Sequence, residues 1–316
     1  PLVKDILSAE LRGSVCVLTY TNDEALQVSG LLLKNGMPAQ LIQDNSGFCL
    51  LKLDEINFFL SRLHSVEDIF LIDDDVWEQA KKELQTVFQN SSKLESCLGL
   101  IRDFETINPK RRYKSDLELF IRESKLNDFF GENGETIFVS TIHKVKGKEF
   151  DHVFLMLNNF NLSSDERIRQ LYVAMTRARR ELTIHLNSDF LDGLSSEAVE
   201  HIEDKNDYLP PEELAIHLTH SDIWLDYFIN RQPQIAQLRS GDTLYVRGDE
   251  CLDGNGQSVL KFSRNFMSEH YERLHRQGYE LKSAMVNFIV YWQSEKVAKE
   301  IKIILPELFF ERKKIS

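Results

Sequence analysis

The sequence Thr-Ile-His-Lys-Val-Lys-Gly-Lys-Glu-Phe at residues 141–150 and the sequence Leu-Tyr-Val-Ala-Met-Thr-Arg-Ala-Arg at residues 171–179 decide the fold. Both blocks border strand-like apolar runs, at residues 137–139, 153–157 and 182–186. Polar blocks next to short apolar runs indicate loops at the ends of buried strands. Ligands of open α/β sheets bind at strand ends, so the two blocks predict a ligand site.

The N-terminal residues predict a strand-helix-strand unit. Residues 14–20 form a continuous apolar run that is typical of a buried strand, and residues 39–42 form a second strand. Between them, residues 22–34 place apolar side chains on one helical face, with Asn22 or Asp23 as the expected N-cap. Two strands joined by a helix are normally parallel, so this unit predicts a parallel α/β sheet.

Both blocks resemble motifs of a known family. The block at residues 141–150 is similar to the Thr-Leu-His-x-x-Lys-Gly-Leu-Glu-Phe motif of the UvrD/Rep-like superfamily 1 DNA helicases, and the block at residues 171–179 is similar to their Tyr-Val-Ala-x-Thr-Arg-Ala motif. The blocks follow the family's order and approximate spacing, with strands in the matching places, and this combination is specific. The resemblance implies the C-terminal portion of such a helicase, with its second RecA-like domain and a C-terminal extension.

The domain boundaries follow from this resemblance and from composition. We expect a second RecA-like domain at residues 1–53 and 135–187, a helical insertion at residues 54–134, an acidic linker at residues 188–220, and a small α+β or β-rich domain at residues 221–316. Relatives often carry a small SH3-like or Tudor-like barrel at this C-terminal position. The expected fold class is α/β, a RecA-like parallel sheet with a helical insertion, followed by this β-rich domain.

Composition limits the classes of protein. The chain has 316 residues, 42% of them apolar, and a formal net charge of -12. Nine carboxylates and a single lysine lie between residues 189 and 220, so the rest of the chain is nearly balanced and can present a basic face to nucleic acid. No apolar run approaches the length of a membrane span, and we expect a cytoplasmic protein without membrane contact.

The four cysteines show no metal-binding pattern. Cys16, Cys49, Cys97 and Cys251 are widely separated and form no Cys-x-x-Cys pair, which argues against a zinc site or an iron-sulfur cluster. We expect free, buried thiols that pack as small apolar groups, and no metal site.

Arg177 matches the arginine of the family's Thr-Arg-Ala sequence, and the resemblance implies that it is a catalytic arginine finger. A guanidinium group stays charged and donates paired hydrogen bonds to phosphate oxygens, so it can stabilise the charge that develops in phosphoryl transfer. The alternative is a surface arginine on an Arg-rich helix, as we expect for Arg179 and Arg180.

Three further positions bear on the nucleotide. Glu149 matches an acidic residue that contacts the nucleotide in relatives, and Gly147 allows the backbone to approach a phosphate or to form a left-handed turn. Outside the motif, Gly-Lys-Glu would be an ordinary turn. Relatives also present an arginine after Leu-Tyr that contacts the γ-phosphate, but Thr21 occupies its place here. This departure implies weaker catalysis or another basic group at the phosphate.

Thr141 and His143 match the Thr-x-His sequence that meets single-stranded DNA in the family. Their hydroxyl and imidazole groups can hydrogen-bond phosphate, and alternation along Val139, Thr141 and His143 would point these side chains to one face. Lys144 and Lys146 would add phosphate contacts. The alternatives are a histidine satisfied in the core and lysines that are only solvated.

The sequence lacks a Gly-x-x-x-x-Gly-Lys-Ser/Thr phosphate loop and a clear Asp-Glu pair that would hold Mg²⁺. The Asp73-Asp74-Asp75 run is expected to be an acidic helix cap. Because the chain also begins with Pro1, we expect a C-terminal fragment of a longer helicase. An N-terminal RecA-like domain would bind most of the ATP and Mg²⁺, and the fragment alone would be inactive.

The expected partners are single-stranded DNA or a single-strand/double-strand junction, the N-terminal RecA-like domain of the same protein, and a protein partner for the C-terminal domain. A rival interpretation is a non-catalytic protein-interaction module with a helicase-like fold, which the loss of the arginine at Thr21 slightly favours. A second rival is a helicase-nuclease subunit, but no Asp and Glu-x-Lys arrangement on paired strands supports it.

Overall fold

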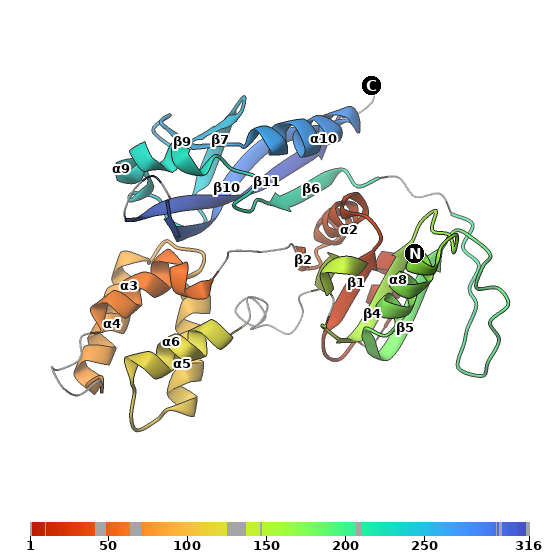
Figure 1. Cartoon of the computed structure of the whole chain (residues 1–316), viewed down its shortest axis with the longest axis horizontal. Helices are drawn as coiled ribbons and strands as arrows, with labels where there is room; N and C mark the ends of the chain where they lie inside the picture. The colour runs from red at the N-terminus through yellow and green to blue at the C-terminus, as the bar shows by residue number, and fades with distance from the viewer. Residues whose placement is uncertain are drawn as a thin grey trace. The chain divides into compact units, whose positions relative to one another are not determined.

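The computed structural model describes residues 2–9, 11–41, 49–63, 71–124, 137–145, 147–206, 210–294, 296 and 299–313. The chain divides into two compact units, each built from two stretches of sequence: unit 1 comprises Pro1–Asp44 and Asn133–Ala215, and unit 2 comprises Asn45–Glu132 and Ile216–Ser316. Unit 1 is built around a five-stranded sheet and unit 2 around a six-stranded sheet, and most of their strands are labelled in Figure 1.

The sheet of unit 1 is parallel throughout. Its strands are β1 (Val15–Thr19), β2 (Ala39–Leu41), β3 (Ile137–Thr141), β4 (Phe150–Leu157) and β5 (Ala178–Leu186). They lie in the order β2-β3-β1-β4-β5, and every neighbouring pair is parallel. The predicted α/β class with a RecA-like parallel sheet is confirmed.

Helical elements cover both faces of this sheet. On one face lie α1 (Leu2–Ser8) and α2 (Asn22–Lys34), and on the other lie η2 (Ile142–Val145) and α8 (Asp165–Met175). Strand β1 contributes Val15 and Val17 to the first apolar cluster and Cys16 and Leu18 to the second. Successive side chains of a strand point to opposite faces, so the apolar run of β1 forms two cores at once.

Unit 2 contains the helical insertion. Its elements are η1 (Leu50–Lys52), α3 (Asp54–Arg62), α4 (Asp74–Val87), α5 (Leu94–Ile107) and α6 (Lys114–Glu123). The buried Trp77 ring packs against Phe59 and Phe104, with centroid distances of 5.2 and 5.9 Å. As predicted, the Asp73-Asp74-Asp75 run lies at the N-terminus of α4, where carboxylates interact favourably with the helix dipole.

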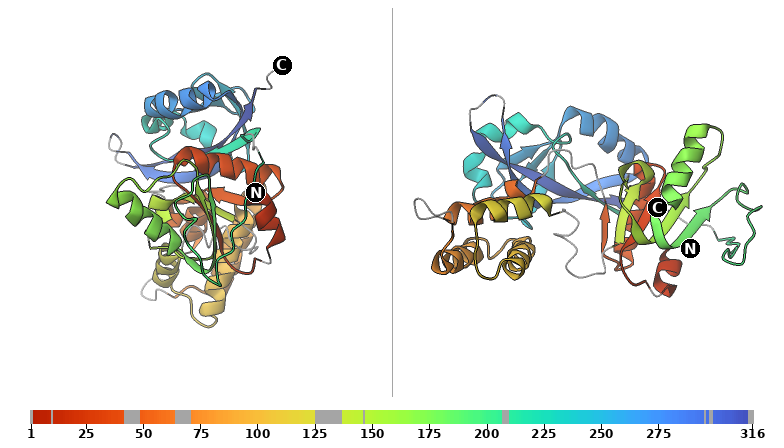
Figure 2. Two further views of the ribbon diagram at one scale, coloured as in Figure 1. Left: turned by 90° about the vertical axis from the view of Figure 1, so that its right-hand side faces the viewer. Right: turned by 60° about the horizontal axis from the view of Figure 1, so that its bottom comes forward.

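The second part of unit 2 is rich in β-structure. Its strands are β6 (Glu213–His217), β7 (Thr243–Arg247), β8 (Glu250–Leu252), β9 (Ser258–Lys261), β10 (Tyr279–Gln293) and β11 (Glu300–Arg312), in the order β6-β11-β10-β7-β8-β9. The antiparallel β10 and β11 form the long pair of blue strands in Figure 2. Four short helical elements accompany them: η3 (Leu225–Asn230), α9 (Gln232–Ile235), η4 (Phe266–Tyr271) and α10 (Glu272–Arg276). The predicted β-rich C-terminal part is confirmed, and the SH3-like or Tudor-like label stays a prediction.

The helical insertion and the β-rich part belong to one compact unit joined by buried polar contacts, although the sequence suggests separate segments at residues 54–134 and 221–316. Asp54 is almost fully buried, and its carboxylate pairs with the Lys302 ammonium group of β11 at 2.7 Å. The buried Glu55 carboxylate accepts hydrogen bonds from the Ser91 hydroxyl at 2.5 Å and from the Ser240 hydroxyl at 3.1 Å. Buried charges need such partners, so α3 depends on contacts that are distant in sequence.

The acidic stretch predicted as a linker at residues 188–220 is only partly irregular. Described residues 193–206 are exposed and contain no helix or strand. Strand β6 then begins at Glu213 and joins the six-stranded sheet next to β11. Among the described residues, no helix has the length and apolar character needed to cross a membrane.

The cysteines match their prediction as free thiols. Cys16, Cys97 and Cys251 are buried, and Cys49 is half-buried. Burial raises the pKa of the Cys16 thiol well above its ordinary value, and the same cause raises the pKa of Cys97. A protonated, buried thiol is a poor nucleophile, so these residues are packing groups.

Candidate functional site

The two motif blocks meet at the amino ends of β4 and β5. The backbone carbonyl of Arg177 accepts a hydrogen bond of 2.8 Å from the amide of Phe150, the first residue of β4. The Arg177 guanidinium group donates to three oxygen atoms, those of the Val173 carbonyl at 2.8 Å, the Lys148 carbonyl at 3.1 Å and the Thr176 hydroxyl at 3.2 Å. Guanidinium has more N–H donors than these bonds use, so some have no partner among the described residues.

The loop of the first block, residues 147–149, lies beside this arginine. Gly147 has φ +82°, a left-handed conformation that favours glycine, and nothing lies within 4 Å of the position that a Cβ atom would take. Glu149 is exposed, and its Oε2 pairs with Arg179 Nε at 3.2 Å. Gly147, Glu149 and Arg177 therefore gather at one end of the sheet, which we call the amino edge.

Thr141 lies at the opposite end of the sheet, where β1, β3 and β4 finish. It pairs in register with Thr19 of β1, and Thr19 pairs with Met156 of β4. Met156 lies six residues after Phe150, which corresponds to roughly 20 Å along the strand. We call this end, with Thr19 to Thr21 and Thr141, the carboxyl edge. The first motif block crosses the sheet from the carboxyl edge to the amino edge.

His143 does not continue the strand. Thr141 is 5% exposed and ends β3, whereas His143 is exposed and belongs to η2. The predicted alternation to one face is wrong, because the chain turns after Thr141 and buries Ile142 and Val145 in the cluster under α8. Lys144 of η2 is half-buried. Lys146 lies outside the described residues.

Thr21 caps a helix at the carboxyl edge. Its hydroxyl accepts a hydrogen bond of 3.2 Å from the Glu24 amide, and the Glu24 carboxylate accepts one of 3.0 Å from the Thr21 amide. This reciprocal pair is a capping box for α2, so the predicted N-cap at Asn22 or Asp23 is wrong. The structure does not bring Thr21 together with Arg177, because the two residues lie at opposite edges.

An aromatic-cationic cluster at the carboxyl edge was not predicted. The Arg167 guanidinium carbon lies 5.1 Å from the centroid of the Tyr20 ring and 5.6 Å from that of Phe160. The two rings pack edge to face with centroids 5.3 Å apart. One feature of the sequence could have indicated this cluster, because Arg167 lies in the first turn of a helix that follows a strand end. The contact itself joins residues far apart in the sequence, so no local pattern predicts it.

The described residues fit part of a nucleotide site. The unused donors of Arg177 and the open backbone at Gly147 suit a phosphate group. Among the residues that the structure describes, no group of three or more His, Cys, Asp or Glu side chains could hold a metal ion. The residues that the structure describes thus fit a phosphate contact and do not by themselves form a complete Mg²⁺ site.

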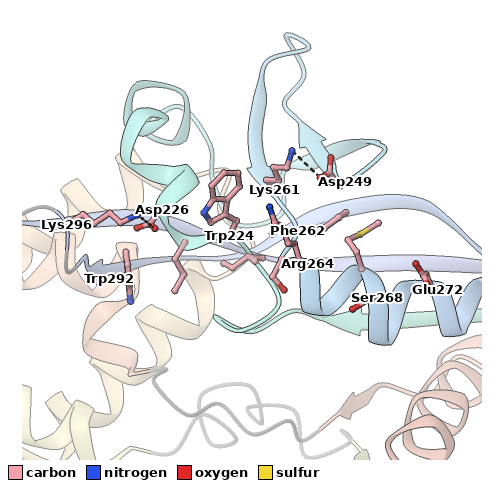
Figure 3. A pocket seen from close by; sticks show the side chains of 14 residues that line it. Trp224, Asp226, Asp249, Lys261, Phe262, Arg264, Ser268, Glu272, Trp292 and Lys296 are labelled. Carbon is pink, nitrogen blue, oxygen red and sulfur yellow. Dashed lines mark hydrogen bonds and ion pairs between the residues drawn. The ribbon is translucent and has the colours of Figure 1, made fainter.

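Unit 2 contains a separate pocket of about 1050 Å³ beside η3, β9 and α10 (Figure 3). The Trp224 side chain, which is 50% exposed, stands in the centre of this view. Lys261 pairs with Asp249 at 3.1 Å and Lys296 pairs with Asp226 at 2.6 Å. Each of these lysines is matched by a carboxylate, so the rim lacks the excess positive charge that phosphates require.

Two comparisons with known proteins agree with the resemblance. A family model described as the UvrD-like helicase C-terminal domain matches residues 61–189, which contain both motif blocks. A stretch of 101 residues is 33% identical to the RecBCD enzyme subunit RecB of Chlamydia pneumoniae, and it covers 30% of this chain and 10% of that protein. The matched part of the chain thus spans about a tenth of that relative's length.

Proposed function

We propose that this chain, which carries the C-terminal portion of a UvrD-like superfamily 1 helicase, supplies one half of an ATP-driven DNA helicase or translocase. The observation that carries the proposal is the meeting of both motif blocks at the amino edge. There the Arg177 guanidinium group is held by the carbonyls of Val173 and Lys148, beside Gly147. A pre-positioned guanidinium group can stabilise the charge of phosphoryl transfer without reorganisation.

The nucleotide is ATP, with Mg²⁺, bound mostly by a RecA-like domain that contains a phosphate loop. This chain's sequence has no such loop, so its own contribution is Arg177 with contacts from Gly147 and Glu149. Bound Mg²⁺ would neutralise phosphate charge during transfer. We expect the 316-residue chain by itself to hydrolyse no ATP. We leave Thr21 out of the nucleotide site because it lies at the carboxyl edge.

The carboxyl edge would form part of the track for single-stranded DNA. His143 is exposed and can hydrogen-bond a phosphate, and Lys144 follows it on η2. Thr141 is buried, so we assign it a structural role: it holds the end of β3 in place beneath this surface. In open parallel sheets ligands bind outside the carboxyl ends of the strands, which supports the same assignment.

The test is ATP hydrolysis in a protein that joins this chain to a phosphate-loop domain. Arg177→Ala should lower the DNA-stimulated rate by about a thousandfold or more, the effect of losing an arginine finger, at matched nucleotide binding. Arg180→Ala is the matched control, because Arg180 is exposed and pairs with Asp151, which is not a proposed nucleotide contact. It should change the rate by less than about fivefold, since exposed ion pairs contribute about 1 kcal/mol or less.

Three outcomes would contradict the proposal. If Arg177→Ala and Arg180→Ala reduce hydrolysis equally, Arg177 is not the finger. If the joined protein hydrolyses no ATP at any DNA concentration, the interaction-module alternative is the better account. Hydrolysis by the isolated 316-residue chain would contradict the division of labour between the two domains.

A further inference from the structure

We propose that Arg167, held over the Tyr20 ring, is a phosphate contact for single-stranded nucleic acid at the carboxyl edge. The inference rests on the proposed function, because it adds a residue to the same track. Neither motif block contains Arg167, which lies four residues before Leu171, the first residue of the second block.

The guanidinium group of Arg167 is positioned before any ligand arrives. Its guanidinium carbon lies 5.1 Å from the Tyr20 ring centroid and 5.6 Å from that of Phe160, and its Nη1 donates to the Asn161 side-chain oxygen at 3.2 Å. Phe160 is buried, so the lower ring of this stack is anchored in the core. A guanidinium group held in this way loses less conformational freedom on binding than an unrestrained one. Arg167 is half-buried, and its guanidinium N–H groups other than the one bonded to Asn161 have no hydrogen-bond partner among the described residues.

The stack and η2 belong to the same side of the sheet. Phe160, Ile142 and Val145 are members of one buried cluster, and Tyr20 packs against it. Arg167 is on α8, whose Leu171 belongs to the same cluster. The proposed contact therefore lies on the same face of the sheet as η2 and His143. A single-stranded nucleic acid that follows the carboxyl edge would pass over this face.

Three carboxylates lie in the elements around Arg167, and they determine which substitutions can test its proposed role. Glu24 is engaged by the amides of Tyr20 and Thr21 at 3.2 and 3.0 Å, and Asp165 and Glu166 are exposed in the first turn of α8. They weaken any general attraction of phosphate to this region. Binding here must therefore depend on the directed donors of Arg167, and a lysine at this position should not replace it.

The experiment measures binding of an oligothymidylate of about 16 nucleotides to the whole chain by fluorescence anisotropy over a series of salt concentrations. Arg167→Met keeps an apolar stem over Phe160 and removes the charge. It should weaken binding about tenfold, the effect of losing a hydrogen bond to a charged group, and should lower the salt slope by about 0.7. Arg167→Lys should also lose most of this affinity.

Arg169→Met is the matched control. Arg169 lies on the same helix, is exposed, and donates its Nε to the Asp165 carbonyl at 3.1 Å. It should bind within about twofold of the wild type, because one solvated surface charge contributes little. Thermal unfolding by circular dichroism checks that each variant is folded; if Arg167→Met is not, the comparison of Arg167→Lys with the wild type decides.

The outcomes separate this inference from the proposed function. If the wild type binds the oligothymidylate and Arg167→Met binds equally well, Arg167 only covers Phe160 and the inference is overturned. If Arg167→Lys retains full affinity, the stacked geometry is irrelevant and the inference is also overturned. If the wild type binds no oligothymidylate even at low salt, the carboxyl-edge track itself fails, and Arg167 fails with it.

Discussion

The two edges of the five-stranded sheet use their polar side chains differently. At the amino edge, Arg177 bonds to carbonyls of its own chain, and Asp151 accepts hydrogen bonds from the amide and hydroxyl of Ser14. At the carboxyl edge, His143 is exposed and Tyr20 carries a half-buried arginine on its ring. The amino edge is thus internally bonded, whereas the carboxyl edge presents groups outward.

This difference shows how one short motif can serve two ligands. The first block starts at Thr141 on the carboxyl edge and ends at Glu149 on the amino edge, roughly 20 Å away along the strands. A nucleotide at the amino edge and a nucleic acid at the carboxyl edge would therefore touch the two ends of one continuous segment. Such a segment is a physical connection between the two proposed sites.

The largest effect is expected from a substitution that disrupts the hydrogen bonds at the amino edge. Gly13 has φ +106°, and a Cβ atom there would lie 2.3 Å from Asp151 Oδ2. Gly13→Ala should lower the free energy of local unfolding of β1 by about 3 kcal/mol, because it adds backbone strain and displaces Asp151 from Ser14. Hydrogen exchange of the β1 amides measures this change.

Gly36→Ala is the matched control for Gly13→Ala. Gly36 also has a positive φ, of +72°, but nothing lies within 4 Å of its would-be Cβ atom. It should cost only about 1 kcal/mol, the backbone component alone. Equal losses for the two variants would show that the contact with Asp151 is unimportant for the amino edge.

A smaller effect should depend on pH. Hydrogen bonds from the Ser14 amide and hydroxyl lower the pKa of Asp151 below its ordinary value of 3.8. A lowered carboxyl pKa contributes stability that is present above the unfolded-state pKa and is lost as the pH falls through the folded-state pKa. Asp151→Asn should therefore destabilise unit 1 by about 1 kcal/mol at neutral pH, and by much less once the pH has fallen below the folded-state pKa, which itself lies below 3.8. Hydrogen exchange at neutral pH and acid titration followed by circular dichroism test this, and a difference that persists at low pH would contradict it.

The smallest expected effect sharpens the assignment of the carboxyl edge. Thr21→Arg introduces a cation beside Tyr20, so it should raise oligothymidylate affinity by about threefold and steepen the salt dependence by about 0.7. Thr21→Ala removes only the helix cap and should cost about 1 kcal/mol of stability. An increase in nucleotide affinity for Thr21→Arg, without a change in DNA affinity, would instead assign Thr21 to the nucleotide.

Much of unit 1 could be predicted from local sequence. The helix predicted at residues 22–34 is α2 with the same bounds, and the apolar runs became parallel strands in the expected places. Hydrophobic periodicity and helix caps are local signals, so they can be recognised without knowledge of the tertiary structure. The meeting of Arg177 with the first block followed from the family motifs alone.

The remaining features depend on contacts between distant residues. Thr21 lies far from Arg177 because β1, β4 and β5 are parallel. The end of β1 and the start of β5 therefore lie at opposite edges of the sheet. The contact of Arg167 with Tyr20 joins residues that are 147 positions apart in the sequence (167 - 20). The buried pair of Asp54 and Lys302 likewise joins the insertion to the β-rich part, and no local pattern signals it.

The most direct test of the two-edge account is hydrogen-deuterium exchange of the whole chain with and without oligothymidylate. The account predicts slower exchange at residues 19–24 and 142–145, which lie at the carboxyl edge, and no change at residues 148–150 and 177–179. Protection confined to residues 148–150 and 177–179 would contradict it, because the nucleic acid would then occupy the edge assigned to the nucleotide.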